Sequence, residues 1–193
     1  MKLILASKSP RRHDILNWMG IPFEAEVCPE PEIAPAGLSA AEAVCVLAYH
    51  KASFVRNHHP DAFVLGADTI VMHDGEILGK PASAEQAKVY LSRLSGNTHT
   101  VYTGVALLHG NYEDIRSDAT DVTFRHLCQE EIDWYVSTSE PLDKAGAYGI
   151  QGLASVFVEK IVGNYFNVIG LPAPVVYEML LKSRFLSASR QSI

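Results

Sequence analysis

Cysteine is scarce in this chain, and its three cysteines form no motif. Cys28, Cys45 and Cys128 are widely spaced, odd in number and in no CxxC pair. A disulfide-stabilised secreted domain has many paired cysteines, and a thiolate zinc site has closely spaced ones. The sequence therefore indicates neither, and we expect all three cysteines to be reduced and structural.

Long hydrophobic runs are also missing. No stretch approaches the roughly 18 apolar residues of a membrane-spanning helix. Residues 1–6 lack the long apolar region and the small-residue cleavage site of a secretory signal. We therefore expect a cytoplasmic protein that has no membrane partner.

An excess of positive charge is absent as well. The chain has 16 Lys and Arg against 22 Asp and Glu, a formal net charge of −6. Binding to a nucleic-acid polymer needs clustered cations, so this balance argues against it, and any phosphate ligand must meet a local positive site. With 48% apolar residues, the 193-residue chain has enough material for one large domain. We expect residues 1–193 to form that single domain.

Helix signals recur along the chain. Ser9 and Pro10 predict the start of a helix, which should end at Gly20. Ser39 and Glu42 form a capping box for a second helix, which should stop near Pro60. Further helices are expected after Ser83, over residues 130–136 and over residues 172–185, while residues 186–193 look frayed.

Apolar and alternating segments predict strands between these helices. They cover residues 2–6, 62–67, 98–108, 112–124 and 155–162, with a hairpin at Asp74-Gly75 and a glycine-bearing loop over residues 141–152. Helices alternate with strands early and hairpins dominate later. The pattern predicts an α/β fold with a mixed sheet flanked by helices.

The segment SKSPRR, residues 7–12, lies between a predicted strand and a predicted helix. The first N–H groups of a helix are unsatisfied and carry the positive end of its dipole, and Arg11 and Arg12 add two guanidinium groups in the same turn. Together they suit the phosphates of a triphosphate. The alternative is an ordinary helix start with two solvated arginines.

Asp68 follows the predicted strand 62–67, a position where α/β proteins commonly present ligand-binding groups. Its carboxylate can hold a divalent cation or take a proton from water; the alternative is a turn aspartate that accepts backbone hydrogen bonds. Lys80 returns after the hairpin, so Asp68 and Lys80 are candidates to face one cleft. A lone lysine there is otherwise simply solvated.

The segment DKAGAYGIQG, residues 143–152, places small residues around Tyr148 and Gln151. Small residues let the backbone approach a planar ligand, and a Gln amide can donate and accept towards a nucleobase. The alternative is a tight surface loop. Glu32 and Lys51 are surface charges unless something ties them to a site.

Seven blocks in order give the chain a resemblance that no single block carries. They are LILASxSPRR, HKA, GADTIV, ILGKP, LSGxxHxVYTGVAL, DKAGAYGIQG and NYFNVIGLP. This order resembles the Maf family of nucleotide pyrophosphatases, from about Leu3 to Leu180.

The resemblance implies a fold similar to that of inosine triphosphate pyrophosphatases, elongated and with a cleft between two lobes. It implies hydrolysis of a nucleoside triphosphate to the monophosphate and pyrophosphate with Mg²⁺ or a similar ion, in a homodimer. By position, Asp68 matches the catalytic and metal-binding acid, and Glu32 matches its acidic partner at the metal. The phosphate-binding set is matched by Ser7, Arg11, Arg12, Lys51 and Lys80, and Lys80 is also counted as catalytic.

Two carboxylates with water and phosphate oxygens suit Mg²⁺ or Mn²⁺ rather than zinc. The eight histidines show no HxH or HExxH spacing that would indicate a zinc site. The family has an Asp-Glu pair where this chain has Pro31-Glu32, so Glu30 remains an alternative to Glu32 as the second acid.

The resemblance also bears on the substrate. Arg11, Thr69 and Gln151 resemble the branch of the family that acts on dTTP, UTP and related pyrimidine nucleotides, with Thr69 and Gln151 in substrate-binding positions. The alternatives are a pyrophosphatase for purine nucleotides or 7-methyl-GTP, and a nucleotide-sensing regulator of septum formation with little turnover.

Overall fold

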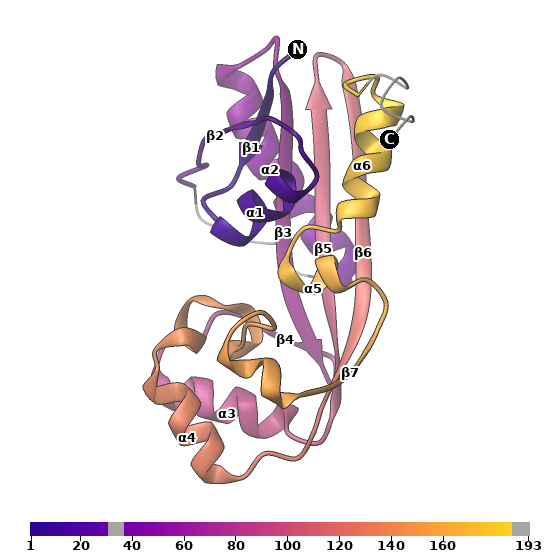
Figure 1. The fold of residues 1–193 in the computed structure, drawn as a ribbon. Helices are drawn as coiled ribbons and strands as arrows, with labels where there is room; N and C mark the ends of the chain where they lie inside the picture. Colours follow the sequence, from indigo (N-terminus) through magenta and orange to yellow (C-terminus); the bar gives the residue numbers. More distant parts are fainter. Residues whose placement is uncertain (31–36, 187–193) are drawn as a thin grey trace. The chain divides into compact units, whose positions relative to one another are not determined.

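The computed structural model describes residues 1–30 and 37–186. In that part of the chain the strands form one seven-stranded sheet in the order β2-β1-β3-β5-β6-β7, with β4 paired to β3 (Figure 1). The strands are β1 Leu3–Ala6, β2 Glu24–Ala25, β3 Phe63–His73, β4 Glu76–Leu78, β5 Thr98–His109, β6 Tyr112–Phe124 and β7 Val158–Val162. The α-helices are α1 Pro10–Trp18, α2 Ala40–His58, α3 Ala84–Leu94, α4 Gln129–Ser137, α5 Tyr165–Ile169 and α6 Ala173–Lys182.

The sheet contains both parallel and antiparallel pairs. Strand β1 runs parallel to β2 and to β3, whereas β4 is antiparallel to β3 and β7 is antiparallel to β6. The predicted α/β class with a mixed sheet and helices is therefore confirmed. The cleft between two lobes stays a prediction.

The chain packs as two compact units. Unit 1 contains Met1–Asp68, Thr103–Asp118 and the segment from Gly170 onward; unit 2 contains Thr69–Tyr102 and Ala119–Ile169. Strands β3, β5 and β6 each contribute residues to both units. The expectation of one domain over residues 1–193 stays a prediction.

The core of unit 1 is built from small and branched apolar side chains. Helix α2 packs against the sheet through alanines, while β1, β3 and β5 contribute the facing residues. The cluster consists of Ile4, Ala6, Ala48, Ala52, Val55, Ala62, Val64, Ala106 and Leu108. Alanine on the helix keeps its backbone close to the strands.

The core of unit 2 is aromatic. Phe124 packs edge to face against His99, Tyr148 and Phe157, with ring centroids 5.1, 4.8 and 6.1 Å apart. Tyr135 of α4 joins this aromatic cluster by packing edge to face against Phe157, with the ring centroids 5.3 Å apart. Helices α3 and α4 pack against one another in the same unit.

Most predicted elements are present, but one prediction is wrong at its start. Residues 155–157 do not begin the predicted strand; Leu153–Phe157 forms a 3₁₀-helix and β7 begins only at Val158. The predicted loop 141–152 contains two further short 3₁₀-helices, Glu140–Asp143 and Ala145–Ala147. Neither β2 nor α5 was expected. Of the stretch predicted to fray, residues 187–193 lie outside the described residues.

None of the helices described is both long enough and apolar enough to cross a bilayer.

Candidate functional site

Helix α2 lies unusually close to two strands of unit 1. A Cβ added at Gly66 of β3 would lie 2.2 Å from the Ala48 carbonyl oxygen and 2.9 Å from the Ala52 Cβ. A Cβ added at Gly104 of β5 would lie 2.3 Å from the Val44 carbonyl oxygen. Glycine is required at both positions because the helix backbone packs directly against the sheet. The position of α2 over β3 and β5 is therefore fixed by residues without side-chain chemistry.

This packing buries a charged pair. Lys51, one turn beyond Ala48 on α2, donates from Nζ to Oδ1 of Asp68 on β3. The side chains are only 11% and 8% exposed, so water screens their attraction little. Because opposite charges taken out of water need close pairing, the two residues hold one another in place. The alternative of Lys51 as a surface charge is wrong.

Asp68 occupies a different position in its strand from the one predicted. Strand β3 does not end at Ala67 but continues to His73, so Asp68 is in mid-strand. The neighbouring strand β1 does end there, because its last residue, Ala6, pairs with Gly66. Asp68 therefore lies beyond the carboxyl end of a parallel neighbour, even though its own strand goes on to the β3–β4 hairpin.

The segment after β1 is held by its own hydroxyl and guanidinium groups. The Ser7 Oγ accepts from the Ser9 N–H at 3.2 Å and from the Arg12 Nη1 at 3.1 Å. The Arg12 Nε donates to the Gly170 carbonyl at 2.8 Å, which ties the segment to the turn before α6. Ser7 is buried, and His13 contacts its carbonyl oxygen at 2.9 Å. These contacts fix the entry to α1 in unit 1.

Helix α1 begins as predicted, but its first turn is not capped by a serine side chain. Ser9 is at the N-cap with extended backbone and Pro10 follows, yet the Ser9 hydroxyl makes no capping hydrogen bond. The first turn contains no acidic residue, and Arg11 is half-buried there. No acidic side chain of the first turn therefore neutralises the positive end of the helix dipole, which favours binding of an anion at this helix end.

Three of the predicted residues, Thr69, Lys80 and Gln151, belong to unit 2. Thr69 is half-buried on β3, directly after Asp68, whereas Lys80 and Gln151 are exposed. The Gly146 N–H donates to the Gly79 carbonyl at 3.1 Å, which joins the segment containing Lys80 to the 143–152 loop. Gly146 has φ of +68°, and a Cβ there would lie 2.9 Å from Val71 Cγ2. Unit 2 therefore brings these two segments together, while a shared cleft for Asp68 and Lys80 stays a prediction.

The loop that contains Gln151 is anchored from α4 and the turn after it. The Tyr135 hydroxyl donates to Glu140 Oε1 at 3.1 Å and accepts from the Gly149 N–H at 3.2 Å. Glu140 Oε2 accepts from the Leu153 N–H at 3.2 Å. A Cβ at Gly152 would meet Glu140 Oε1 at 2.1 Å, so a side chain at this position would displace the Glu140 carboxylate. The loop is a built structure rather than a plain surface turn.

Tyr148 has a structural role and is not available to a planar ligand. It is buried, and its hydroxyl lies 2.8 Å from His99 Nε2. Burial lowers the pKa of His99 to about 3, and the nearby His73 adds to the shift. His99 is therefore a neutral core residue that fixes Tyr148.

Glu32 lies outside the described residues. Glu30, the alternative second acid, is exposed and pairs with His50 Nε2 of α2 at 2.6 Å. Asp68 provides carboxylate oxygens, the donors that a hard divalent cation prefers. The sequence reasoning missed four contributors: Gly66, Gly104, Tyr135 and Glu140. The glycine two residues before Asp68, facing alanines on α2, was the one local signal that a helix approaches there.

Comparison with known proteins agrees with this arrangement of motifs. The family model described as Maf-like protein matches residues 2–183. A dTTP/UTP pyrophosphatase of Symbiobacterium thermophilum is 51% identical over 179 residues, covering 93% of this chain and 92% of the relative. Proteins of the same name from Bacillus cytotoxicus and Bacillus cereus are 52% and 50% identical over 171 residues, each covering 89% of this chain and 90% of the relative.

Similar solved structures are more distant. One is a nucleoside-triphosphatase, dITP/XTP pyrophosphatase, from Mycobacterium abscessus with a TM-score of 0.43 and 17% identity, covering 72% of this chain and 95% of that one. Another is the Staphylococcus aureus Ham1 protein, with a TM-score of 0.42 and 12% identity, covering 64% of this chain and 72% of that one. On the strength of the matched family model and the sequence relatives, the chain belongs to the Maf-like protein family.

Proposed function

We propose that this protein is a nucleoside triphosphate pyrophosphatase that hydrolyses dTTP and UTP to the monophosphate and pyrophosphate. The observation that carries the proposal is the buried Asp68 carboxylate paired with Lys51, in the unit that also contains Ser7, Arg11 and Arg12. Curated relatives of about half-identical sequence named dTTP/UTP pyrophosphatase support the substrate class.

The reaction needs a base and cations. A water oxygen attacks the α-phosphorus, the bond from that phosphorus to the oxygen bridging to the β-phosphorus breaks, and pyrophosphate departs. We assign to Asp68 the removal of the water proton, and Lys51 holds its carboxylate in place. Charge grows on the α-phosphate oxygens and on the departing group, so fixed cations there stabilise the transition state.

Arg11 and Arg12 are the cations proposed for the phosphates in unit 1. Both lie in the first turn of α1, and Arg12 is already oriented by Ser7 and Gly170. An oriented guanidinium loses less side-chain entropy when it binds an anion. The family resemblance assigns Lys80, Thr69 and Gln151 to the substrate too, and the anchoring of the Gln151 loop by Tyr135 and Glu140 supports a fixed position for that amide.

A divalent cation, Mg²⁺ or Mn²⁺, is proposed as the cofactor. Asp68 fits it because a carboxylate is a hard oxygen donor, and Glu32 is proposed as the second ligand. When bound, such an ion neutralises phosphate charge and polarises the phosphoryl group. A homodimer, a cytoplasmic location and a link to septum formation are further proposals, which rest on the sequence expectations and the family resemblance.

The test uses the full chain with Mg²⁺ and either dTTP or UTP. Pyrophosphate release should be fast for the native chain and reduced by several orders of magnitude in Asp68→Asn, since the amide can neither take a proton nor bind the cation tightly. Circular dichroism and the melting temperature check that the variant is folded. Equal turnover by the folded variant would remove Asp68 from its role, and tight nucleotide binding without turnover by the native chain would favour a sensing function.

A further inference from the structure

A second group of metal-binding side chains lies beside α2 in unit 1. The Cys28 Sγ, a carboxylate oxygen of Glu30 and a ring nitrogen of His50 all lie within 4.8 Å of one another. Cys28 and Glu30 come from the segment after β2, and His50 comes from the middle of α2. Sequence spacing does not reveal this group because its members come from two distant segments.

The segment that contains Cys28 runs along α2 in a matched register. Glu26 contacts His58 Nδ1 at 3.0 Å and His59 Nε2 at 2.6 Å, while Glu30 contacts His50 Nε2 at 2.6 Å. From residue 26 to residue 30 an extended chain spans roughly 13 Å, and from residue 50 to residue 58 a helix rises roughly 12 Å. The two lengths are similar, so Glu26 and Glu30 can both reach α2, although the chain bends at residue 30.

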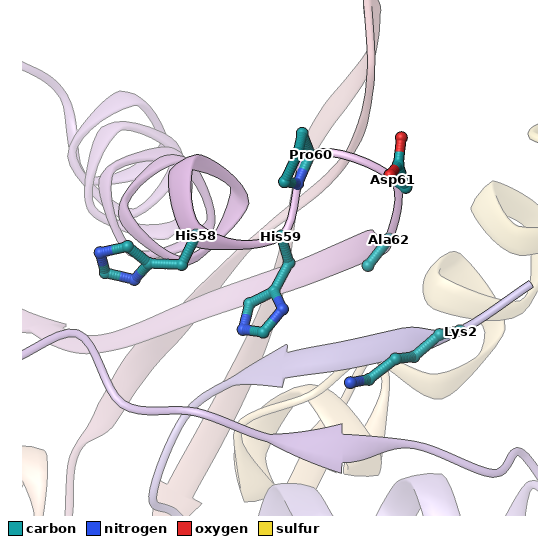
Figure 2. A pocket seen from close by; sticks show the side chains of 6 residues that line it. All are labelled: Lys2, His58, His59, Pro60, Asp61 and Ala62. Carbon is teal, nitrogen blue, oxygen red and sulfur yellow. The ribbon is translucent and has the colours of Figure 1, made fainter.

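Alternation along that segment places Cys28 on the helix side. In an extended chain, residues two apart point to the same side, and Glu26 and Glu30 both reach α2. Cys28 lies between them in sequence, and its Sγ lies within 4.8 Å of the ligand atoms of Glu30 and His50. Figure 2 shows His58 and His59, which lie at the C-terminal end of α2 and line a hollow there together with Lys2.

The donor set is chemically selective. A thiolate, an imidazole and a carboxylate are the ligands of zinc-type ions, whereas Mg²⁺ takes oxygen donors. Ligand atoms around a tetrahedral zinc are separated by roughly 3.3–3.6 Å, given the usual bond lengths. Glu30 and His50 at 2.6 Å need to part slightly, and the other distances need to shorten by no more than roughly 1.5 Å.

We propose that Cys28, Glu30 and His50 form a binding site for a zinc-type divalent cation, with water in the fourth position. Coordination releases the Cys28 thiol proton and clips the segment onto α2, one residue before Lys51. If the function proposed above holds, this engagement of Glu30 favours Glu32 as the second acid of the catalytic pair.

The experiment titrates the reduced, metal-free full chain with Co²⁺ and records absorbance. A thiolate-to-cobalt charge-transfer band and the visible bands of four-coordinate cobalt should grow to one equivalent. Stoichiometric Zn²⁺ should remove the bands and excess Mg²⁺ should not. Cys28→Ser and His50→Gln should each weaken cobalt binding at least about tenfold, because each removes a preferred ligand.

The chain offers matched controls. Cys45→Ser, Cys128→Ser and His126→Gln should leave the cobalt spectrum unchanged, since none of these residues belongs to the group. The proposal is overturned if the native chain gives no charge-transfer band, or if the band survives in Cys28→Ser. Mg²⁺-dependent pyrophosphate release should be unchanged in Cys28→Ser. The cobalt titration therefore tests the metal site, and pyrophosphate release tests the pyrophosphatase assignment independently of it.

Discussion

Replacement of Gly66 by alanine tests how Lys51 reaches Asp68. The new Cβ would lie 2.2 Å from the Ala48 carbonyl oxygen and 2.9 Å from the Ala52 Cβ. Carbon atoms in contact are usually about 3.5 Å apart or more, so α2 and β3 must separate by roughly 1 Å. The first clash is with backbone, and therefore no side-chain rotation can relieve it.

The separation should cost both stability and activity. Overpacking of a dense core typically costs ~1–3 kcal/mol, and a backbone clash belongs at the upper end of that range. The same shift moves Lys51 relative to Asp68, and a misplacement of about 1 Å near the chemistry lowers turnover on the order of 10²-fold. We expect Gly66→Ala to lose ~2–3 kcal/mol of unfolding free energy and roughly a hundredfold in turnover.

Urea denaturation followed by circular dichroism measures the first quantity, and initial rates of pyrophosphate release from UTP measure the second. Gly79→Ala is the matched control for stability, because the added methyl group meets nothing within 4 Å. Its unfolding free energy should stay within about 0.5 kcal/mol of the native value. If Gly66→Ala has the native midpoint and native rate, the helix is not held against the strand in the way described.

Two further predictions concern buried ionisable groups. Lys51→Met leaves the Asp68 carboxylate without this partner in a buried site, so the unfolding free energy should fall by ~3–5 kcal/mol. Adding Asp68→Asn should recover part of that loss. A double variant with a lower unfolding free energy than Lys51→Met alone would contradict the pairing. The pKa of His99 is lowered to about 3, so between the usual value near 6.5 and about 3 the unfolded chain takes up a proton that the folded chain does not. The free energy of unfolding should therefore fall with falling pH by up to ~1.4 kcal/mol per pH unit in this window. The fall should be less steep in His99→Phe, whereas His126→Gln, a control at an exposed site, should keep the native slope. Urea denaturation at several pH values measures these slopes.

The elements that sequence predicted well are those with a local physical cause. The capping box at Ser39 and Glu42 is formed in both directions at the start of α2. The Asp74-Gly75 pair makes the β3–β4 turn with φ of 49° and 77°, the left-handed conformation that such a hairpin needs. In these cases the residues that specify the structure are neighbours in sequence, so the pattern is sufficient.

The errors occur where a distant contact decides the outcome. Residues 155–162 alternate like a strand, but Phe157 packs on Phe124 and Tyr135, and the Leu153 N–H donates to Glu140. Those contacts favour a 3₁₀-helix over an extended chain. The pairing of Lys51 with Asp68 was missed for the same reason, because burial of Lys51 depends on Gly66 and Gly104 in separate strands.

The buried ion pair itself argues that unit 1 was built for chemistry rather than for stability. Two charges removed from water gain little net free energy from pairing, and an apolar pair of similar volume is often equally or more stable at such a site. The nearby core of α2 and β3 contains Ala48, Ala52 and Val64, and α2 contacts β3 at Gly66, so an apolar pair is compatible with this core. A carboxylate kept there, beyond the end of β1 and in the same unit as the Arg11 and Arg12 turn, is what a proton-accepting, cation-binding role requires. The burial of Asp68 therefore fits the role proposed for this carboxylate, whereas stability alone does not explain why the pair is charged.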